Sequence, residues 1–134
     1  MSTTDARKPS GRLRGSESAL AQFRAGFKVR TESAANALGG NTALADYLGV
    51  NKAQLSRWTS GDSLPTTENA RVLADLDYVV TRLRLVWGDG VTVYNWLTGS
   101  NSFLEGARPI DVLRLRGVAP VLKAIELEIA GAYA

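Results

Sequence analysis

Residues 41–61, NTALADYLGVNKAQLSRWTSG, decide the fold because they combine two short helical patterns with a glycine turn between them. The first pattern opens at Asn41, or at Gly40 before it. Three apolar residues then share one helical face, namely Leu44, Ala45 and Leu48. The sequence therefore predicts a short helix with one buried face.

The turn that follows contains residues that end one helix and start another. Gly49 is able to adopt the left-handed conformation that ends a helix. Val50 is apolar and suits the angle between two helices. Asn51 is a favourable N-cap, and Gln54 three residues later adds a signal like that of a capping box. A second helix is therefore predicted to begin at Lys52.

This second helix divides into an inward and an outward side. Leu55 and Trp58 are three residues apart and are predicted to face inward. The outward side then consists of Lys52, Ala53, Ser56 and Arg57. Lysine and arginine donors suit guanine O6 and N7 or phosphate, and an alanine methyl group suits thymine. The outward side thus has the chemistry of a surface that reads the DNA major groove.

Polar residues at the two helix starts extend this surface. Asn41 and Gln54 lie at or near helix N-termini, where phosphates bind. The candidate DNA-binding residues are Asn41, Asn51, Lys52, Ala53, Gln54, Ser56 and Arg57. The competing interpretation is an ordinary helical hairpin with solvated polar residues, since two short helices joined by a glycine turn are a common packing unit.

The segment resembles the helix-turn-helix of the Xre, or phage-repressor-like, class of DNA-binding proteins. The positions that carry the resemblance are Leu44, Ala45, Leu48, Gly49, Val50, Asn51, Leu55, Ser56, Arg57, Trp58, Gly61 and Pro65. The resemblance implies a helical bundle whose recognition helix runs from Lys52 to about Ser60 and lies in the major groove of operator DNA.

The composition favours a small, all-α protein without catalytic activity. The chain has 134 residues, enough for one domain or two very small ones, and only four are prolines. It contains no cysteine and no histidine. A disulfide framework, a thiol nucleophile, the usual general base and the commonest metal ligand are therefore missing. We expect no catalytic residues, no metal site and no cofactor.

Positive charge is concentrated at the N-terminus. Residues 1–30 hold seven basic and two acidic residues, whereas the rest of the chain holds nine basic and eleven acidic ones. Residues 1–15 are basic and rich in Ser, Thr and Gly, which predicts a flexible tail. Such a tail is either an arm that contacts DNA phosphates or a leader without a role. It lacks the apolar run of a signal peptide, and no segment reaches membrane-spanning length, so we expect a cytoplasmic protein.

Order is predicted to begin near Ser16 or Glu17, and residues 16–87 are expected to form the helix-turn-helix domain. Apolar residues share one helical face up to the glycine pair at 39–40: Leu20, Phe23, Phe27, Ala34, Ala35 and Leu38. The sequence predicts two helical pieces here, with a break at Gly26 or Thr31.

The longest predicted helix runs from a cap at Thr66 or Thr67 to about Trp87. Its apolar stripe is broad and consists of Val72, Leu73, Leu76, Val79, Val80, Leu83, Val86 and Trp87. A small helix-turn-helix domain needs less apolar surface than this to close its core. Either a second protomer of a symmetric dimer or the C-terminal part of the chain packs on the stripe, and the sequence leaves both open.

Residues 88–134 follow a different pattern, in which short helices are separated by Gly, Asn and Pro. One short helix is expected over residues 91–97. Pro109 suits the first position of a second helix, and Pro120 is predicted to open a last helix that ends at Gly131. We therefore expect a small helical C-terminal module.

This module resembles the toxin-binding part of Xre/MbcA/ParS-type antitoxins. The resemblance rests on the order Trp96, Leu97, Asn101, Leu104, Gly106, Pro109, Leu113, Gly117, Val121, Ile125 and Gly131, directly behind the helix-turn-helix and the long helix. The chain departs from the pattern at Ser100, where a proline is common, and over residues 113–117, a span shorter than usual. Taken singly, Trp96, Asn101 and Pro109 also fit ordinary roles in the core, a cap and a helix start.

The resemblance implies the antitoxin of a type II toxin-antitoxin system of the RES-Xre kind. Its partner would be a RES-domain toxin that consumes NAD, so the NAD chemistry would belong to the toxin. The antitoxin would occlude the toxin's active site, form a homodimer and a larger complex with the toxin, and repress the shared operon. The candidate toxin-binding residues are Arg108, Leu115, Arg116, Glu128, Tyr133 and Ala134.

Two other functions compete with this one. A stand-alone repressor would use the same helix-turn-helix, and residues 88–134 would serve dimerisation or effector binding. An enzyme would need a catalytic constellation that the sequence lacks. We rank the antitoxin first, the stand-alone repressor second and the enzyme third.

Overall fold

The computed structural model describes the backbone of residues 2–132 and the side chains of residues 18, 19, 21, 22 and 24–132. This part of the chain is all-α, as the sequence predicts, and none of its helices is long and apolar enough to cross a membrane. The helices are, in order, α1 (Ser2–Leu38), α2 (Asn41–Leu48), α3 (Lys52–Ser60), α4 (Thr67–Trp87), α5 (Gly90–Thr98), the 3-10 helix η1 (Ser102–Leu104), α6 (Pro109–Arg116) and α7 (Val118–Ala132).

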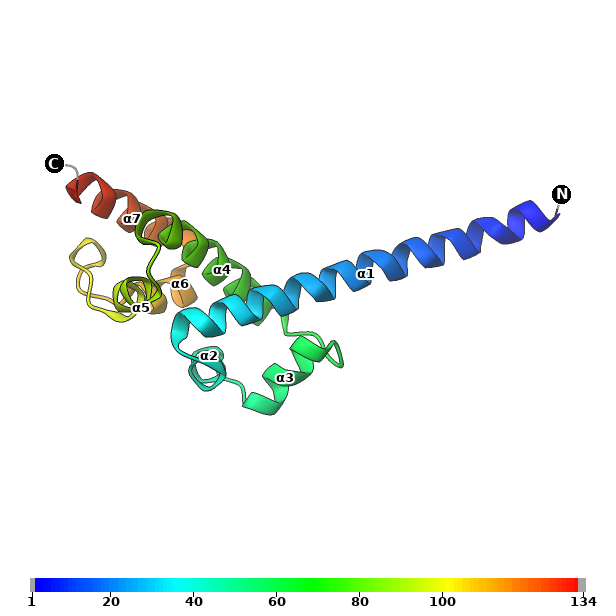
Figure 1. Cartoon of the computed structure of the whole chain (residues 1–134), viewed down its shortest axis with the longest axis horizontal. Helices are drawn as coiled ribbons and strands as arrows, with labels where there is room; N and C mark the ends of the chain where they lie inside the picture. The colour runs from blue at the N-terminus through cyan, green and yellow to red at the C-terminus, as the bar shows by residue number, and fades with distance from the viewer. Residues whose placement is uncertain (1, 133–134) are drawn as a thin grey trace.

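The first helix, α1, differs from the sequence-based expectation because it starts earlier and is unbroken. Residues 2–15, predicted as a flexible tail, form its beginning, and Figure 1 shows this part extending away from the other helices. Extension of a helix from turns that are already packed adds one hydrogen bond per residue and needs no new nucleus. The basic side chains of the predicted DNA arm lie outside the described residues.

The predicted break inside α1 is wrong, because the helix is continuous from Ser2 to Leu38. Thr31 is buried, and its hydroxyl donates a 2.6 Å hydrogen bond to the backbone carbonyl of Phe27, so it is satisfied within the helix. A glycine such as Gly26 costs only about 1 kcal/mol in a helix interior, which the packing of the following turns can offset.

The helix-turn-helix itself is as predicted. Gly40 is the N-cap of α2, and Gly49 ends the helix in the left-handed region, with a φ of 72°. Val50 is half-buried against the core. Asn51 is the N-cap of α3, which begins at Lys52. Both short helices contact α1, which crosses above them in Figure 1.

Helix α4 forms the centre of the molecule. The side-chain oxygen of Thr66 caps it by accepting a 3.2 Å hydrogen bond from the N–H of Asn69. Most of the predicted stripe is buried, namely Val72, Leu73, Leu76, Val79, Val80 and Leu83. Val86, which was also assigned to the stripe, is exposed. Because α4 contacts α1, α5, α6 and α7, the chain's own C-terminal helices cover the stripe.

The C-terminal helices pack on the same core as the helix-turn-helix. Pro109 occupies the first turn of α6, as predicted. α7 begins at Val118, so Pro120 lies inside its first turn, where the missing N–H of proline needs no partner. The helix also continues past the predicted stop at Gly131, to Ala132. One continuous apolar cluster runs from Phe27 to Ile125 and joins both parts of the chain.

Candidate nucleic-acid interface

One side of α3 is apolar and buried, and the other is polar and exposed. Leu55 and Trp58 are each only 2% exposed and pack in the core. The side chains of Lys52, Ala53, Ser56 and Arg57 are exposed. The predicted division of this helix is therefore confirmed, and its polar side is open to solvent.

The two cations on this side are free to bind an anion. Within the described residues, neither the Lys52 ammonium nor the Arg57 guanidinium has an ion-pair or hydrogen-bond partner. The ion pairs in this part of the chain are made by Arg71 and Arg108. A contact with a phosphate or a guanine would therefore displace only water and would break no bond within the protein.

The N-terminal cap of α3 uses polar groups of Asn51 and Gln54, which limits the contacts that these two residues can make with DNA. The side-chain oxygen of Asn51 accepts a 2.7 Å hydrogen bond from the backbone N–H of Gln54. Only the NH₂ end of the exposed Asn51 amide is then left to donate to a phosphate. Gln54 is half-buried, and only its side chain remains for an outside partner.

Asn41 lies on α2 and is brought next to α3. It borders a hollow in the surface together with Lys52, Ala53, Ser56 and Thr59. Four of the predicted DNA-binding residues therefore lie together although they come from two helices. Arg57, Asn51 and Gln54 do not border this hollow.

Arg24 of α1 is a basic residue near α3 that the sequence analysis did not select. Its Cδ lies 3.4 Å from the position that a Cβ on Gly61 would occupy, which places the side chain beside the C-terminal cap of α3. Arg24 is exposed and has no hydrogen-bond or ion-pair partner among the described residues. The only signal in the sequence was the excess of positive charge over residues 1–30.

Residues 36–76 match the family model described as a helix-turn-helix. The chain carries an Xre-type helix-turn-helix domain. The match runs from the end of α1 through α2 and α3 into α4 and so includes the whole exposed face of α3. This family consists of DNA-binding regulators. No curated protein and no solved structure matches the chain.

Among the predicted toxin-binding residues that the structure describes, Arg108 borders one pocket, and Leu115 and Arg116 border another. Arg108 is bound to Asp111 through hydrogen bonds of 2.7 and 3.0 Å and borders a cavity next to α2. Leu115 is 82% exposed and borders a shallow groove with Arg116. Tyr133 and Ala134 lie outside the described residues.

Glu128 is not on the outward side as expected. It is half-buried, and its carboxylate accepts a 3.2 Å hydrogen bond from the indole N–H of Trp96. The ring of Trp96 in turn lies 6.1 Å from that of Trp87, measured between centroids. Glu128 thus helps to hold α7 against α5.

Asn101 has the ordinary structural role that the sequence left open. It is buried, and its side-chain oxygen accepts a 2.9 Å hydrogen bond from the N–H of Phe103. Its backbone carbonyl accepts further bonds from the N–H groups of Leu104 and Gly106. The residue therefore holds the turn around η1 together.

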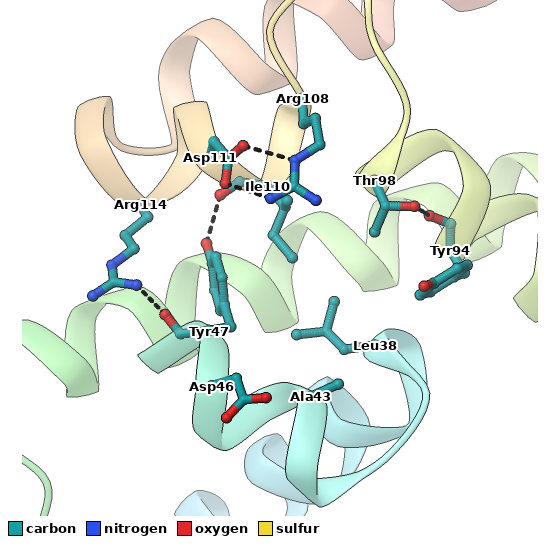
Figure 2. Close-up of a pocket in the computed structure, with 10 residues that line it drawn as sticks. All are labelled: Leu38, Ala43, Asp46, Tyr47, Tyr94, Thr98, Arg108, Ile110, Asp111 and Arg114. Atoms are coloured by element: carbon teal, nitrogen blue, oxygen red, sulfur yellow. Dashed lines mark hydrogen bonds and ion pairs between the residues drawn. The ribbon is translucent and has the colours of Figure 1, made fainter. Parts of the chain in front are cut away.

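The helix-turn-helix and the C-terminal helices are joined by polar contacts centred on Tyr47 of α2, shown in Figure 2. Its hydroxyl donates a 2.6 Å hydrogen bond to the carbonyl of Ile110, and its own carbonyl accepts one from the Arg114 guanidinium. The Arg71 guanidinium donates a 2.9 Å bond to the carbonyl of Arg114. Burial raises the pKa of the Tyr47 hydroxyl well above its ordinary value, so the hydroxyl stays protonated and keeps donating.

Proposed function

We propose that this chain is a transcriptional repressor that binds operator DNA through α3 and that it also acts as the antitoxin of a type II toxin-antitoxin system. The observation that carries the DNA-binding part is the exposed polar face of α3, on which Lys52 and Arg57 have no partner within the described residues. These two cations would supply base and phosphate contacts, while Asn41 and Asn51 would bind the flanking phosphates.

The repressor is proposed to act as a homodimer, because helix-turn-helix proteins usually read two half-sites of a symmetric operator. Tyr78 and Leu85 on α4 support this, since they lie seven residues apart on one helical face and are 56% and 80% exposed. Two large apolar side chains on one face are suited to a symmetric contact with a second copy.

The antitoxin role is proposed from the resemblance of α5 to α7 to the toxin-binding part of Xre/MbcA/ParS-type antitoxins. The partner would be a RES-domain toxin, and its NAD-consuming site would be occluded by the C-terminal helices. Leu115 supports this proposal because it is 82% exposed and lies between two exposed arginines, Arg114 and Arg116. An apolar centre with a charged rim is the usual build of a protein-protein contact.

The test is to express the chain together with the product of the adjacent gene in the same cells. We expect the two proteins to co-purify, the neighbour alone to deplete NAD and stop growth, and the pair to do neither. Leu115→Asp should abolish protection and leave DNA binding intact. Glu126→Gln, at another exposed position, is the matched control and should protect fully. A neighbour that neither binds the chain nor consumes NAD would contradict the antitoxin role.

A stand-alone repressor is the second candidate. One observation favours it, namely that α5, α6 and α7 cover the apolar stripe of α4 and share its core. These helices therefore have a structural role that needs no partner protein. The same co-expression experiment separates the two candidates, because a stand-alone repressor would bind its operator without any partner protein.

A further inference from the structure

A cavity of about 380 Å³ lies where the helix-turn-helix meets the C-terminal helices. Leu38 of α1 and Tyr47 of α2 line one side, and Tyr94 of α5 and Ile110 of α6 line the other (Figure 2). We call it the junction cavity. Its volume lies within the range in which proteins bind small organic molecules, and such sites are common where two parts of a protein meet.

Part of the lining of the junction cavity is apolar and aromatic, and the rest is polar or charged. Leu38 and Ile110 are 5% and 4% exposed, so the floor is well buried. In Figure 2 the Tyr47 ring has the Arg114 guanidinium on one side and Leu38 on the other, and Tyr94 lies across the cavity beyond Leu38. Two aromatic rings that border one apolar space suit a flat ligand.

Among the charged residues of the lining, one carboxylate has no protein partner in the described part of the chain. Arg108 and Asp111 neutralise each other through their two hydrogen bonds. The Arg114 guanidinium donates to the carbonyl of Tyr47 and lies 5.8 Å from the centroid of that ring. The Asp46 carboxylate also lines the cavity, and it has no hydrogen-bond or ion-pair partner among the described residues.

We propose that the junction cavity binds a small planar amine. The ammonium group of the ligand pairs with the Asp46 carboxylate, and its ring lies over Leu38 between Tyr47 and Tyr94. The two tyrosine rings add an apolar contact for the ring of the ligand. The Tyr94 hydroxyl, which makes no hydrogen bond in the described part of the chain, supplies a further hydrogen bond.

Such a ligand would contact both parts of the protein at once. Asp46 and Tyr47 belong to α2, the first helix of the helix-turn-helix, whereas Tyr94 and Ile110 belong to the C-terminal helices. The junction cavity shares no lining residue with the hollow that Asn41 and Lys52 border beside α3.

The test is a titration of the full chain with tryptamine and with indole-3-acetate, which share a ring but carry an ammonium and a carboxylate respectively. We expect tryptamine at millimolar concentration to shift the backbone amide signals of Ala43, Tyr47 and Thr98 saturably, and indole-3-acetate to leave them in place. Asp46→Asn should weaken tryptamine binding about tenfold, the usual loss for a charged hydrogen bond. Glu126→Gln, which removes an exposed carboxylate outside the cavity, should not weaken it.

Asp46 is exposed and unpaired, so its replacement should leave the fold intact, and the amide spectrum of the variant reports this directly. Tyr94→Ala provides a second variant, since Tyr94 is 42% exposed and its loss should also weaken tryptamine binding. Equal binding of the two probes, tryptamine binding that survives Asp46→Asn, or the absence of a saturable shift would each overturn the proposal.

Discussion

The hydroxyl of Tyr47 on α2 donates a 2.6 Å hydrogen bond to the backbone carbonyl of Ile110 on α6. This bond ties the first helix of the DNA-binding motif to a helix that lies 63 residues further along the chain. Arg114 strengthens the same contact from α6, because its guanidinium reaches the Tyr47 carbonyl and ring. The two parts of the protein are therefore expected to unfold together.

Tyr47→Phe should lower the free energy of unfolding by about 1 kcal/mol, because it removes the hydroxyl and leaves the partly buried Ile110 carbonyl without this donor. Chemical denaturation followed by circular dichroism measures the change, and a single transition is expected for both proteins. Tyr94→Phe is the matched control in the ligand-free protein, since the Tyr94 hydroxyl makes no hydrogen bond among the described residues and its loss should not affect stability. Equal stability of all three proteins would contradict a role for this bond.

The same tyrosine gives the protein a predictable loss of stability in alkali. Burial raises the folded-state pKa of Tyr47 above its ordinary value of 10.0, so the folded protein holds this proton more tightly than the unfolded chain does. The raised pKa therefore contributes its full amount to the stability of the folded protein below about pH 10. Above this pH the free energy of unfolding falls, by at most about 1.4 kcal/mol per pH unit. We expect the wild type to lose stability faster than Tyr47→Phe above pH 10, and parallel curves would contradict the assignment.

Arg24 should contribute a phosphate contact from α1, because its side chain lies beside the C-terminal cap of α3 at Gly61. We expect Arg24→Ala to weaken binding to specific and random DNA to a similar degree, as is typical of a phosphate contact. The slope of log affinity against log salt concentration should fall by about 0.9. Arg82→Ala removes an exposed arginine on α4 and should leave the slope unchanged. If both variants behave alike, Arg24 is not part of the interface.

The features that the sequence predicted are those set by neighbouring residues. The stop at Gly49, the cap at Asn51 and the cap at Thr66 or Thr67 each depend on one residue and the few that follow. All three are present, the last of them at Thr66. The inward and outward sides of α3 follow from the spacing of Leu55 and Trp58 in the same way.

The features that the sequence missed depend on contacts between distant residues. Glu128 had the composition of a surface residue, and only the fold brings it to the Trp96 indole, 32 residues away. Thr31 and Gly26 were plausible helix breakers, yet the packing of α1 on α4 keeps the helix continuous. The sequence also left open which part of the protein packs on the apolar stripe of α4. The residues near α4 in the sequence do not indicate that α5, α6 and α7 pack against it.

The central claim is that the exposed face of α3 reads DNA, and the measurement that tests it most directly uses Lys52→Ala together with Arg57→Ala. The DNA is a duplex that the wild-type protein selects from a random pool, with a scrambled duplex of the same length as the reference. Because both side chains are exposed and unpaired, the double variant should keep its helical signal, and it should lose specific binding, with about 1–3 kcal/mol lost per base contact. A folded double variant that still prefers the selected duplex as strongly as the wild type would contradict the account.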